Sequence, residues 1–197
     1  ISESVYEILR CARRGTEPEF ALELRRTMEA EHEAMANDDS CPMKPARILA
    51  DVRKVMGRSD ILVSDVGAHK MWIARHGDGG FMMNSQELET AVREKVPFVT
   101  LIWEDSSYGL IKWKEQEQFG GEHCYVDFTN PDFKMLAEAM HCKGYRVEKA
   151  EDLIPTLEEA FRQDVPSVIV VPVDYSENMK LSEHLKEVYT KKQEAIL

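Results

Sequence analysis

One apolar run near the middle of the chain constrains the fold more than any other feature. Residues 97–103 read Pro-Phe-Val-Thr-Leu-Ile-Trp, and Thr100 is the one polar residue among them. A strand with one solvated face alternates polar and apolar residues, whereas a strand covered on both faces is apolar almost throughout. We therefore expect this segment to be a strand inside a parallel sheet, with helices on both sides.

Helical and strand patterns alternate around this run. The predicted helices cover residues 46–56, 85–95, 108–118, 132–143, 152–163 and 177–193, and the predicted strands cover 60–65, 97–103, 145–149 and 167–173. Such alternation predicts right-handed crossovers between parallel strands. The expected fold class is α/β: a doubly wound, mainly parallel sheet flanked by helices, preceded by an N-terminal helical segment.

The first 41 residues differ from the rest. Pro18 suits the first turn of a helix, and residues 19–35 carry a loose apolar face on a highly charged helix. Asn37–Ser40 and then Pro42 end that helix. We therefore predict a helical linker or docking segment over residues 1–41 and an α/β domain over residues 42–197.

Charge and hydropathy exclude two classes of partner. The 197-residue chain has a net charge of −11, which argues against a nucleic-acid surface because such surfaces are basic. The longest apolar runs, near 61–63 and 168–173, are too short to cross a bilayer, and the N-terminus lacks a signal pattern. We expect a cytoplasmic protein that binds neither nucleic acid nor membrane.

The four cysteines are scattered, at positions 11, 41, 124 and 142, without a CxxC pair. This spacing predicts free, buried thiols in a reducing compartment. Two His-Cys dipeptides occur, at 123–124 and 141–142, but adjacent side chains rarely point at one metal ion. A zinc site is therefore not expected.

Two acidic residues beside glycines are the strongest candidates for chemistry. Asp78 lies in Gly77-Asp78-Gly79-Gly80, and Asp105 follows the apolar strand. In parallel sheets ligands bind at the carboxyl ends of the strands, where both residues are expected to lie. A magnesium ion held by carboxylates and phosphate oxygens suits such a place. The structural alternative is a turn or capping role for each aspartate.

Four longer stretches carry a resemblance to a known family. They are residues 43–45 (MKP), 61–72 (ILVSDVGAHKMW), 77–91 (GDGGFMMNSQELETA) and 108–113 (YGLIKW). From Pro42 to its end the chain resembles the C-terminal, diphosphate-binding domain of a thiamine-diphosphate enzyme, specifically the catabolic type of acetolactate synthase. The order and length of these stretches make the resemblance specific.

The resemblance implies a role for each matching residue. Asp78, Asp105 and the backbone carbonyl of Ser107 would hold Mg²⁺. Thiamine diphosphate would contact a wider set, and Trp113 matches a residue near the substrate entrance. The cofactor-binding set is Gly67, His69, Gly77, Asp78, Gly79, Gly80, Asp105, Ser107, Tyr108 and Gly109. No catalytic residue is expected in this chain, because the activating glutamate of the family belongs to an N-terminal domain.

The sequence departs from the family pattern in three places. Glu104 stands where the family usually has asparagine, and Ser107 where asparagine is frequent. Between Arg75 and Gly77 the family has several dozen residues, which supply two strands and a helix, whereas here only His76 intervenes. The resemblance therefore implies an internal deletion between His76 and Gly77 and a sheet that lacks two strands.

The implied reaction joins two pyruvate molecules into 2-acetolactate and CO₂, with thiamine diphosphate and Mg²⁺. We expect the chain to act as part of a homo-oligomer or with a complete partner subunit, and to be inactive alone. Two alternatives stay open: a non-catalytic remnant that retains the fold, and an interaction module that docks through its N-terminal helices.

Overall fold

The structure is a computed structural model that describes residues 22, 26, 29–30, 33–63 and 76–176. The chain divides into two units, Ile1–Ala34 and Met35–Leu197. In the first unit every described residue is helical, as predicted for residues 19–35. The predicted domain boundary after residue 41 stays a prediction, and the predicted helix 177–193 lies outside the described residues.

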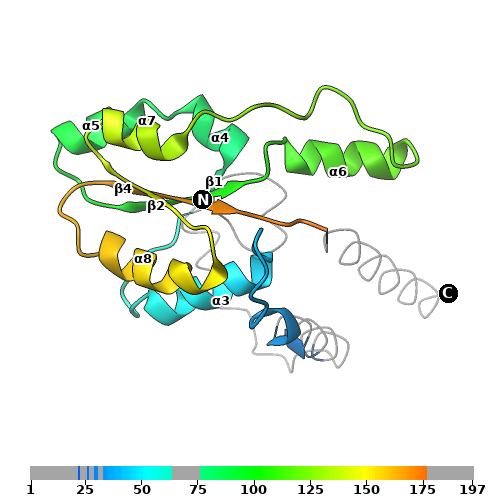
Figure 1. Cartoon of the computed structure of the whole chain (residues 1–197), viewed down its shortest axis with the longest axis horizontal. Helices are drawn as coiled ribbons and strands as arrows, with labels where there is room; N and C mark the ends of the chain where they lie inside the picture. Colours follow the sequence, from blue (N-terminus) through cyan, green and yellow to red (C-terminus); the bar gives the residue numbers. More distant parts are fainter. Residues whose placement is uncertain (1–21, 23–25, 27–28, 31–32, 64–75, 177–197) are drawn as a thin grey trace, which may run out of the picture. The chain divides into compact units, whose positions relative to one another are not determined.

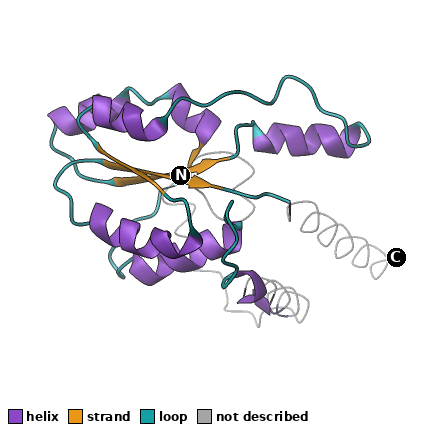
Figure 2. Ribbon diagram, viewed as in Figure 1, coloured by secondary structure: helices purple, strands orange, loops and turns teal. Residues whose placement is uncertain are grey.

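The second unit is built on a parallel sheet (Figure 2). Its described strands are β1 (His76–Gly77), β2 (Val99–Glu104), β3 (Lys143–Arg146) and β4 (Ser167–Pro172), in the order β1-β2-β4-β3. Every described pair is parallel, and Trp103 lies opposite Gly77 on one side and Val171 on the other. The predicted α/β class with a parallel sheet is confirmed.

One face of the sheet packs on α3 (Pro45–Val55) and α8 (Leu153–Ala160), which follows a short 3₁₀ turn at Ala150–Asp152 (Figure 1). Alternate side chains of β2 and β4 point to this face and join a cluster with both helices. It contains Leu101, Trp103, Ile169, Val171, Ile48, Leu49, Val52, Leu153 and Leu157. Burial of these side chains holds the sheet against this helix pair.

The opposite face is covered by α4 (Asp78–Met83), α5 (Glu87–Arg93) and α7 (Phe133–Ala139) (Figure 1). Ile102 and Val170, which alternate with the residues of the first cluster, pack here. Phe81 and Phe133 meet edge to face, with ring centroids 5.5 Å apart. Coverage on both faces explains why β2 and β4 are mostly apolar, as the sequence predicts.

Helix α6 (Gly109–Gln118) lies beyond the carboxyl ends of the strands and has no buried residue (Figure 1). The chain then returns toward the sheet and pairs with the loop that follows β2. Tyr108 N donates to Val126 O at 2.9 Å, and Phe128 N donates to Ser106 O at 3.0 Å. This returning segment therefore fixes the loop that carries Asp105.

Three expectations about elements need correction. Residues 60–63 form no strand, and Ile61 and Val63 are 87% and 75% exposed. An apolar run becomes a strand only where a neighbouring strand pairs with it, and within the described residues none pairs with this one. The strand expected over 145–149 occupies Lys143–Arg146 instead. No strand was predicted directly before Asp78, but His76 and Gly77 form β1 and Asp78 begins α4.

The predicted diphosphate contacts Gly67 and His69 fall outside the described residues. Among the residues that the structure describes, no helix is long and apolar enough to cross a membrane. Cys142 is buried and free as expected, and burial raises the pKa of its thiol. Cys41 and Cys124 are free but exposed, contrary to the prediction of buried thiols, because both lie in loops.

Candidate functional site

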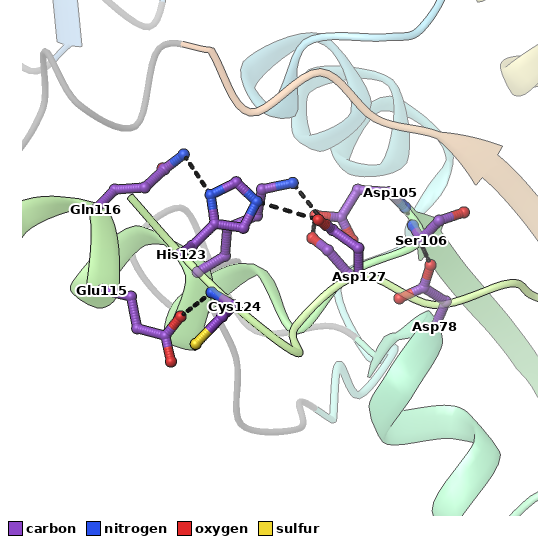
Figure 3. Close-up of polar contacts among 10 residues, drawn as sticks. Asp78, Asp105, Ser106, Glu115, Gln116, His123, Cys124 and Asp127 are labelled. Carbon is purple, nitrogen blue, oxygen red and sulfur yellow. Dashed lines mark hydrogen bonds and ion pairs between the residues drawn. The ribbon is translucent and has the colours of Figure 1, made fainter. Parts of the chain in front are cut away.

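Asp78 is fully buried at the point where β1 ends and α4 begins. Its Oδ1 accepts a hydrogen bond from Gly79 N at 2.8 Å. Its Oδ2 accepts from Asp105 N at 3.1 Å and from Ser106 N at 2.7 Å. The carboxylate therefore connects the end of β1 to the loop after β2, as Figure 3 shows for Asp78 and Ser106.

Asp105 brings a second carboxylate to the same place. Burial raises the pKa of Asp105 to about 6, and the nearby Asp78 carboxylate raises it too, whereas the hydrogen bond from Ser107 lowers it. Ser107 Oγ donates to Asp105 Oδ2 at 2.8 Å. The predicted convergence of Asp78 and Asp105 at the carboxyl ends of neighbouring strands is therefore present in the structure.

The loop that carries Asp105 has an unusual backbone. Ser106 has a φ of +54°, in the left-handed region that residues other than glycine rarely adopt. Both backbone polar groups of Ser106 are engaged, because its N–H donates to Asp78 and its carbonyl accepts from Phe128. These bonds hold a conformation that is unfavourable by itself.

Ser107 forms an antiparallel bridge with Asp127. The two hydrogen bonds of this bridge involve residues 106 and 108, so they do not use the carbonyl of Ser107 itself. The carbonyl predicted as a metal ligand is therefore left unused by the pairing.

The predicted glycines lie around the two carboxylates. Gly77 ends β1, Gly79 and Gly80 lie in the first turn of α4, and Gly109 begins α6. A Cβ added at Gly79 would lie 2.7 Å from Cε1 of Tyr108. Glycine is therefore required there by the neighbouring aromatic ring.

A cavity of about 390 Å³ opens beside Asp105. Asp105, Ser107 and Gly109 line it, together with Lys112 and Trp113 of α6 and Tyr175 after β4. Burial raises the pKa of Tyr175, and the Asp105 and Asp78 carboxylates raise it further. The cavity therefore brings the Asp105 carboxylate together with a lysine and a protonated phenol.

A larger cavity of about 690 Å³ lies at the amino end of β2 and contains neither site aspartate. Its walls are largely apolar and come from β2, α3, α8 and residues 59–63. It offers no convergent pair of charged groups, so the chemistry lies at the opposite end of the strand.

Figure 3 also shows a polar cluster on α6 and the chain that follows it. His123 Nε2 lies 3.0 Å from Asp127 Oδ2, and Lys112 donates to Asp127 Oδ1 at 2.7 Å. The pKa of Asp127 is lowered by Lys112 and then by His123. Within the described part of the chain no group of three or more His, Cys, Asp or Glu side chains is placed to hold a metal ion.

The residues at the carboxyl ends of β1 and β2 fit a hard divalent cation. Oδ2 of Asp78 accepts two backbone hydrogen bonds, whereas Oδ1 accepts one and keeps acceptor capacity. Among the described residues no ion pair compensates Asp78 or Asp105. The buried carboxylate of Asp78 and the half-buried carboxylate of Asp105 repel each other without a cation, and Mg²⁺ prefers such oxygen ligands.

Comparison with known proteins decides the family. Residues 66–171 match the model of the thiamine pyrophosphate enzyme, C-terminal TPP binding domain. The chain belongs to this family. Thiamine pyrophosphate, which is thiamine diphosphate, is the cofactor of the family's enzymes, and Mg²⁺ is its usual metal. The matched span includes Asp78, Asp105 and every other predicted site residue.

The similar proteins include acetolactate synthases. The acetolactate synthase of Bacillus subtilis (strain 168) is 27% identical over 207 residues, covering 84% of this chain and 36% of that protein. The catabolic acetolactate synthase of Raoultella terrigena is 31% identical over 177 residues, covering 69% of this chain and 32% of that protein. The chain therefore spans about a third of the length of these curated relatives.

A thiamine diphosphate-dependent 4-hydroxybenzoylformate decarboxylase from Rhodococcus jostii RHA1 is similar in structure, with a TM-score of 0.48 and 30% identity over 51% of this chain and 19% of that one.

The alignment with the Bacillus subtilis acetolactate synthase is informative in its length. It spans 207 positions but uses 84% of 197 residues, so about forty positions are matched by no residue of this chain. An internal deletion relative to the family agrees with this difference.

Two features of this thiamine pyrophosphate enzyme domain were not predicted from sequence. One is the left-handed Ser106, and the other is Asn130, whose side chain donates to Asp78. A Thr-Asn-Pro-Asp run at 129–132 signals a turn before a helix, but nothing local indicates contact with Asp78. Gly67 and His69 lie outside the described residues, so their predicted contacts with diphosphate stay predictions.

Proposed function

We propose that this chain forms the diphosphate side of an acetolactate synthase-type active site. In this proposal Asp78, Asp105 and the Ser107 carbonyl hold a Mg²⁺ ion that binds the diphosphate of the cofactor. The observation that carries it is the meeting of two carboxylates at the ends of β1 and β2, with Asp105 N donating to Asp78 Oδ2 at 3.1 Å.

The charges around the site support this arrangement. A diphosphate anion is repelled by two carboxylates unless a cation lies between them. Burial disfavours the ionised form of Asp105, so a bound cation relieves a cost that the protein carries without it. Lys112 lines the same cavity, where its ammonium group is paired with Asp127.

Each residue has a defined task in this proposal. Asp78 orients the loop through its hydrogen bonds to residues 105 and 106, and the loop presents Asp105 and the Ser107 carbonyl together. Gly79 leaves room for the ring of Tyr108 beside α4. Thiamine diphosphate supplies the electron sink that allows a 2-oxo acid to lose CO₂.

A thermal-shift titration tests the metal and cofactor site. The full chain is melted with and without MgCl₂ and thiamine diphosphate, and a ligand at about a hundred times its dissociation constant should stabilise it by ~2.7 kcal/mol. Asp78→Asn keeps the size of the side chain and removes its charge, so the shift should disappear. Asp164→Asn, an exposed aspartate before β4, is the matched control and should keep it. An equal shift in Asp78→Asn and wild type refutes the proposed site.

The substrate, product, assembly and location are properties of the whole enzyme. We propose pyruvate as substrate, 2-acetolactate as product, assembly with a second subunit and a cytoplasmic location. The names of the relatives and the family's cofactor support the first two. Incubation with pyruvate, Mg²⁺ and thiamine diphosphate, followed by a colorimetric assay for acetolactate after its conversion to acetoin, tests them.

The shortened alignment supports a second candidate. With about forty family positions unmatched, the chain can retain the metal and diphosphate site without the residues that complete the reaction. A thermal shift with Mg²⁺ and thiamine diphosphate, but no acetolactate from pyruvate even with a complete homologous subunit added, favours this candidate.

A further inference from the structure

We propose that Asn130 is the positioning residue of the metal site: it sets the orientation of the Asp78 carboxylate and fastens the loop after β2 to the start of α4. This inference rests on the proposed function, since it concerns the same cation. It adds a residue to the site that is 52 positions away from Asp78 in sequence.

The hydrogen bonds of the Asn130 amide carry the argument. Its Nδ2 donates to Asp78 Oδ2 at 2.7 Å and lies 3.2 Å from Ser106 Oγ. Because an ionised carboxylate only accepts hydrogen bonds, the amide nitrogen must face Asp78, and this fixes which way the amide is turned. One amide group therefore contacts both the metal-ligand candidate on α4 and the left-handed residue of the loop.

Asn130 completes the set of donors around Asp78 Oδ2. Asp105 N and Ser106 N supply two hydrogen bonds to this oxygen, and Asn130 supplies the third. Three donors occupy Oδ2, so Oδ1, with one donor from Gly79, is the oxygen that keeps capacity for a cation. Without Asn130 the numbers of hydrogen bonds to Oδ1 and Oδ2 of Asp78 become more alike, and the carboxylate no longer offers Oδ1 to the cation in preference to Oδ2.

The other end of the amide shows what this arrangement costs. Asn130 Oδ1 is buried and makes no hydrogen bond to any described residue. A buried, unpaired carbonyl oxygen is unfavourable, and an apolar side chain would avoid the cost. The orientation is therefore set by the Nδ2 contacts with the site and not by the needs of Oδ1.

Asn130 is well anchored for this task. Pro131 follows it, and Asp132 then caps α7 by accepting from Met135 N at 3.0 Å. Phe133, the first residue of α7, is 1% exposed in the core beneath α4. The backbone of Asn130 therefore leads into a helix that Phe133 and Ala137 anchor in the core, so its side chain can hold Asp78 and Ser106 against a fixed reference.

The test measures binding of Mn²⁺, an EPR-active substitute for Mg²⁺, to the full chain. Asn130→Leu keeps the branched shape of the side chain and removes the donor. Loss of a residue that orients a metal ligand typically weakens metal binding 10- to 100-fold, and this is the expected increase in the dissociation constant for Mn²⁺. The EPR line shape of the bound ion at saturation should also change, which a role in folding alone would not cause.

Asn84→Leu is the matched control, because Asn84 is exposed and follows the other end of α4. It should bind Mn²⁺ as the wild type does. If Asn130→Leu does not give the wild-type circular dichroism spectrum, the titration is repeated with Asn130→Ser, which is smaller and polar.

The outcomes separate the two proposals. If a folded Asn130 variant binds Mn²⁺ with the dissociation constant and line shape of the wild type, the role of Asn130 is overturned and the metal site stands. No Mn²⁺ binding by the wild type overturns the proposed metal site, and the role of Asn130 with it. Weaker binding and an altered line shape in Asn130 variants, with Asn84→Leu unaffected, support both.

Discussion

Arg146 donates from Nη2 to Glu104 Oε2 at 2.6 Å, so the last residues of β3 and β2 are joined across the end of β4. The sequence places Glu104 directly before Asp105, where the family usually has asparagine, and an additional carboxylate there would repel a diphosphate. The ion pair neutralises Glu104 and directs it toward β3. The departure from the family pattern is therefore compensated within the same sheet.

A double-mutant cycle on this pair should give a small but measurable coupling. Arg146 is 43% exposed at its side chain, so the expected coupling in the free energy of unfolding is about 0.2–1 kcal/mol. The variants are Glu104→Gln, Arg146→Met and the double mutant, compared by urea denaturation. The coupling should shrink in 1 M NaCl, because salt screens partly exposed charges. Coupling that is zero in low salt contradicts the compensation.

Asp105→Asn should stabilise the chain without metal above pH 6. The pKa of Asp105 is raised to about 6, above the ordinary value near 4, so the folded state binds the extra proton between these two pH values. Stability from this group is therefore present at pH 4 and lost as the pH rises through 6, by at most about 3 kcal/mol. Urea denaturation of wild type and Asp105→Asn from pH 4 to 8 should show the two curves separating between pH 4 and about pH 6 and staying apart above it.

Asp127→Asn is the matched control for that experiment. The pKa of Asp127 is lowered by Lys112 and His123, so its stabilising contribution is present at neutral pH and lost in acid. Asp127→Asn should therefore be less stable than wild type at pH 7, with the difference closing toward pH 3. If both variants change in the same direction at pH 7, the assignment of Asp105 as an uncompensated buried carboxylate is wrong.

Much of the fold could be predicted from residue patterns, because β2 and β4 are covered on both faces and their composition records this directly. The failure at residues 60–63 has a physical reason. Ile61, Leu62 and Val63 have the composition of a strand, but a strand needs a neighbour for its backbone hydrogen bonds, and composition does not supply one.

The candidate site was predictable only in part. The strand before Asp105 was predicted, whereas the two-residue strand β1 before Asp78 was not. The carboxyl ends of neighbouring parallel strands meet at one edge, so the convergence of the two aspartates follows once β1 pairs with β2. Asn130 reaches Asp78 through the path of the chain after α6, and the left-handed backbone of Ser106 depends on its hydrogen bonds. Local sequence records neither of these.

Gly79→Ala should distort the site, and removal of one ring should repair it. The new Cβ would lie 2.7 Å from Tyr108 Cε1, closer than Cβ atoms approach other atoms in proteins, and 3.2 Å from Phe128 Cζ, which is a tight contact. The Tyr108 and Phe128 rings are packed with centroids 4.9 Å apart, so displacing one disturbs both. We expect Gly79→Ala to lower the free energy of unfolding by about 1–3 kcal/mol.

The double variant Gly79→Ala, Tyr108→Ala provides the check. If the clash with Tyr108 is the cause, Gly79→Ala should cost less in the Tyr108→Ala background than in wild type, as measured by chemical denaturation. Equal costs in both backgrounds would mean that the added methyl group acts through the helix and not through the ring.

Substitutions at Ser106 should separate the cost of its backbone conformation from the value of its hydroxyl. With φ at +54°, a β-branched residue is strained, so Ser106→Val should destabilise the fold by about 1–3 kcal/mol. Ser106→Gly relieves the backbone strain but removes the oxygen that lies 3.2 Å from Asn130 Nδ2, so its free energy of unfolding should be close to that of the wild type. Lys95, which has a φ of +55° in an exposed turn away from the site, is the control position: Lys95→Gly should raise stability and Lys95→Val lower it. The measurement is urea denaturation of all four variants. If Ser106→Gly raises the free energy of unfolding as much as Lys95→Gly does, the contact between the Ser106 hydroxyl and Asn130 does not stabilise the loop.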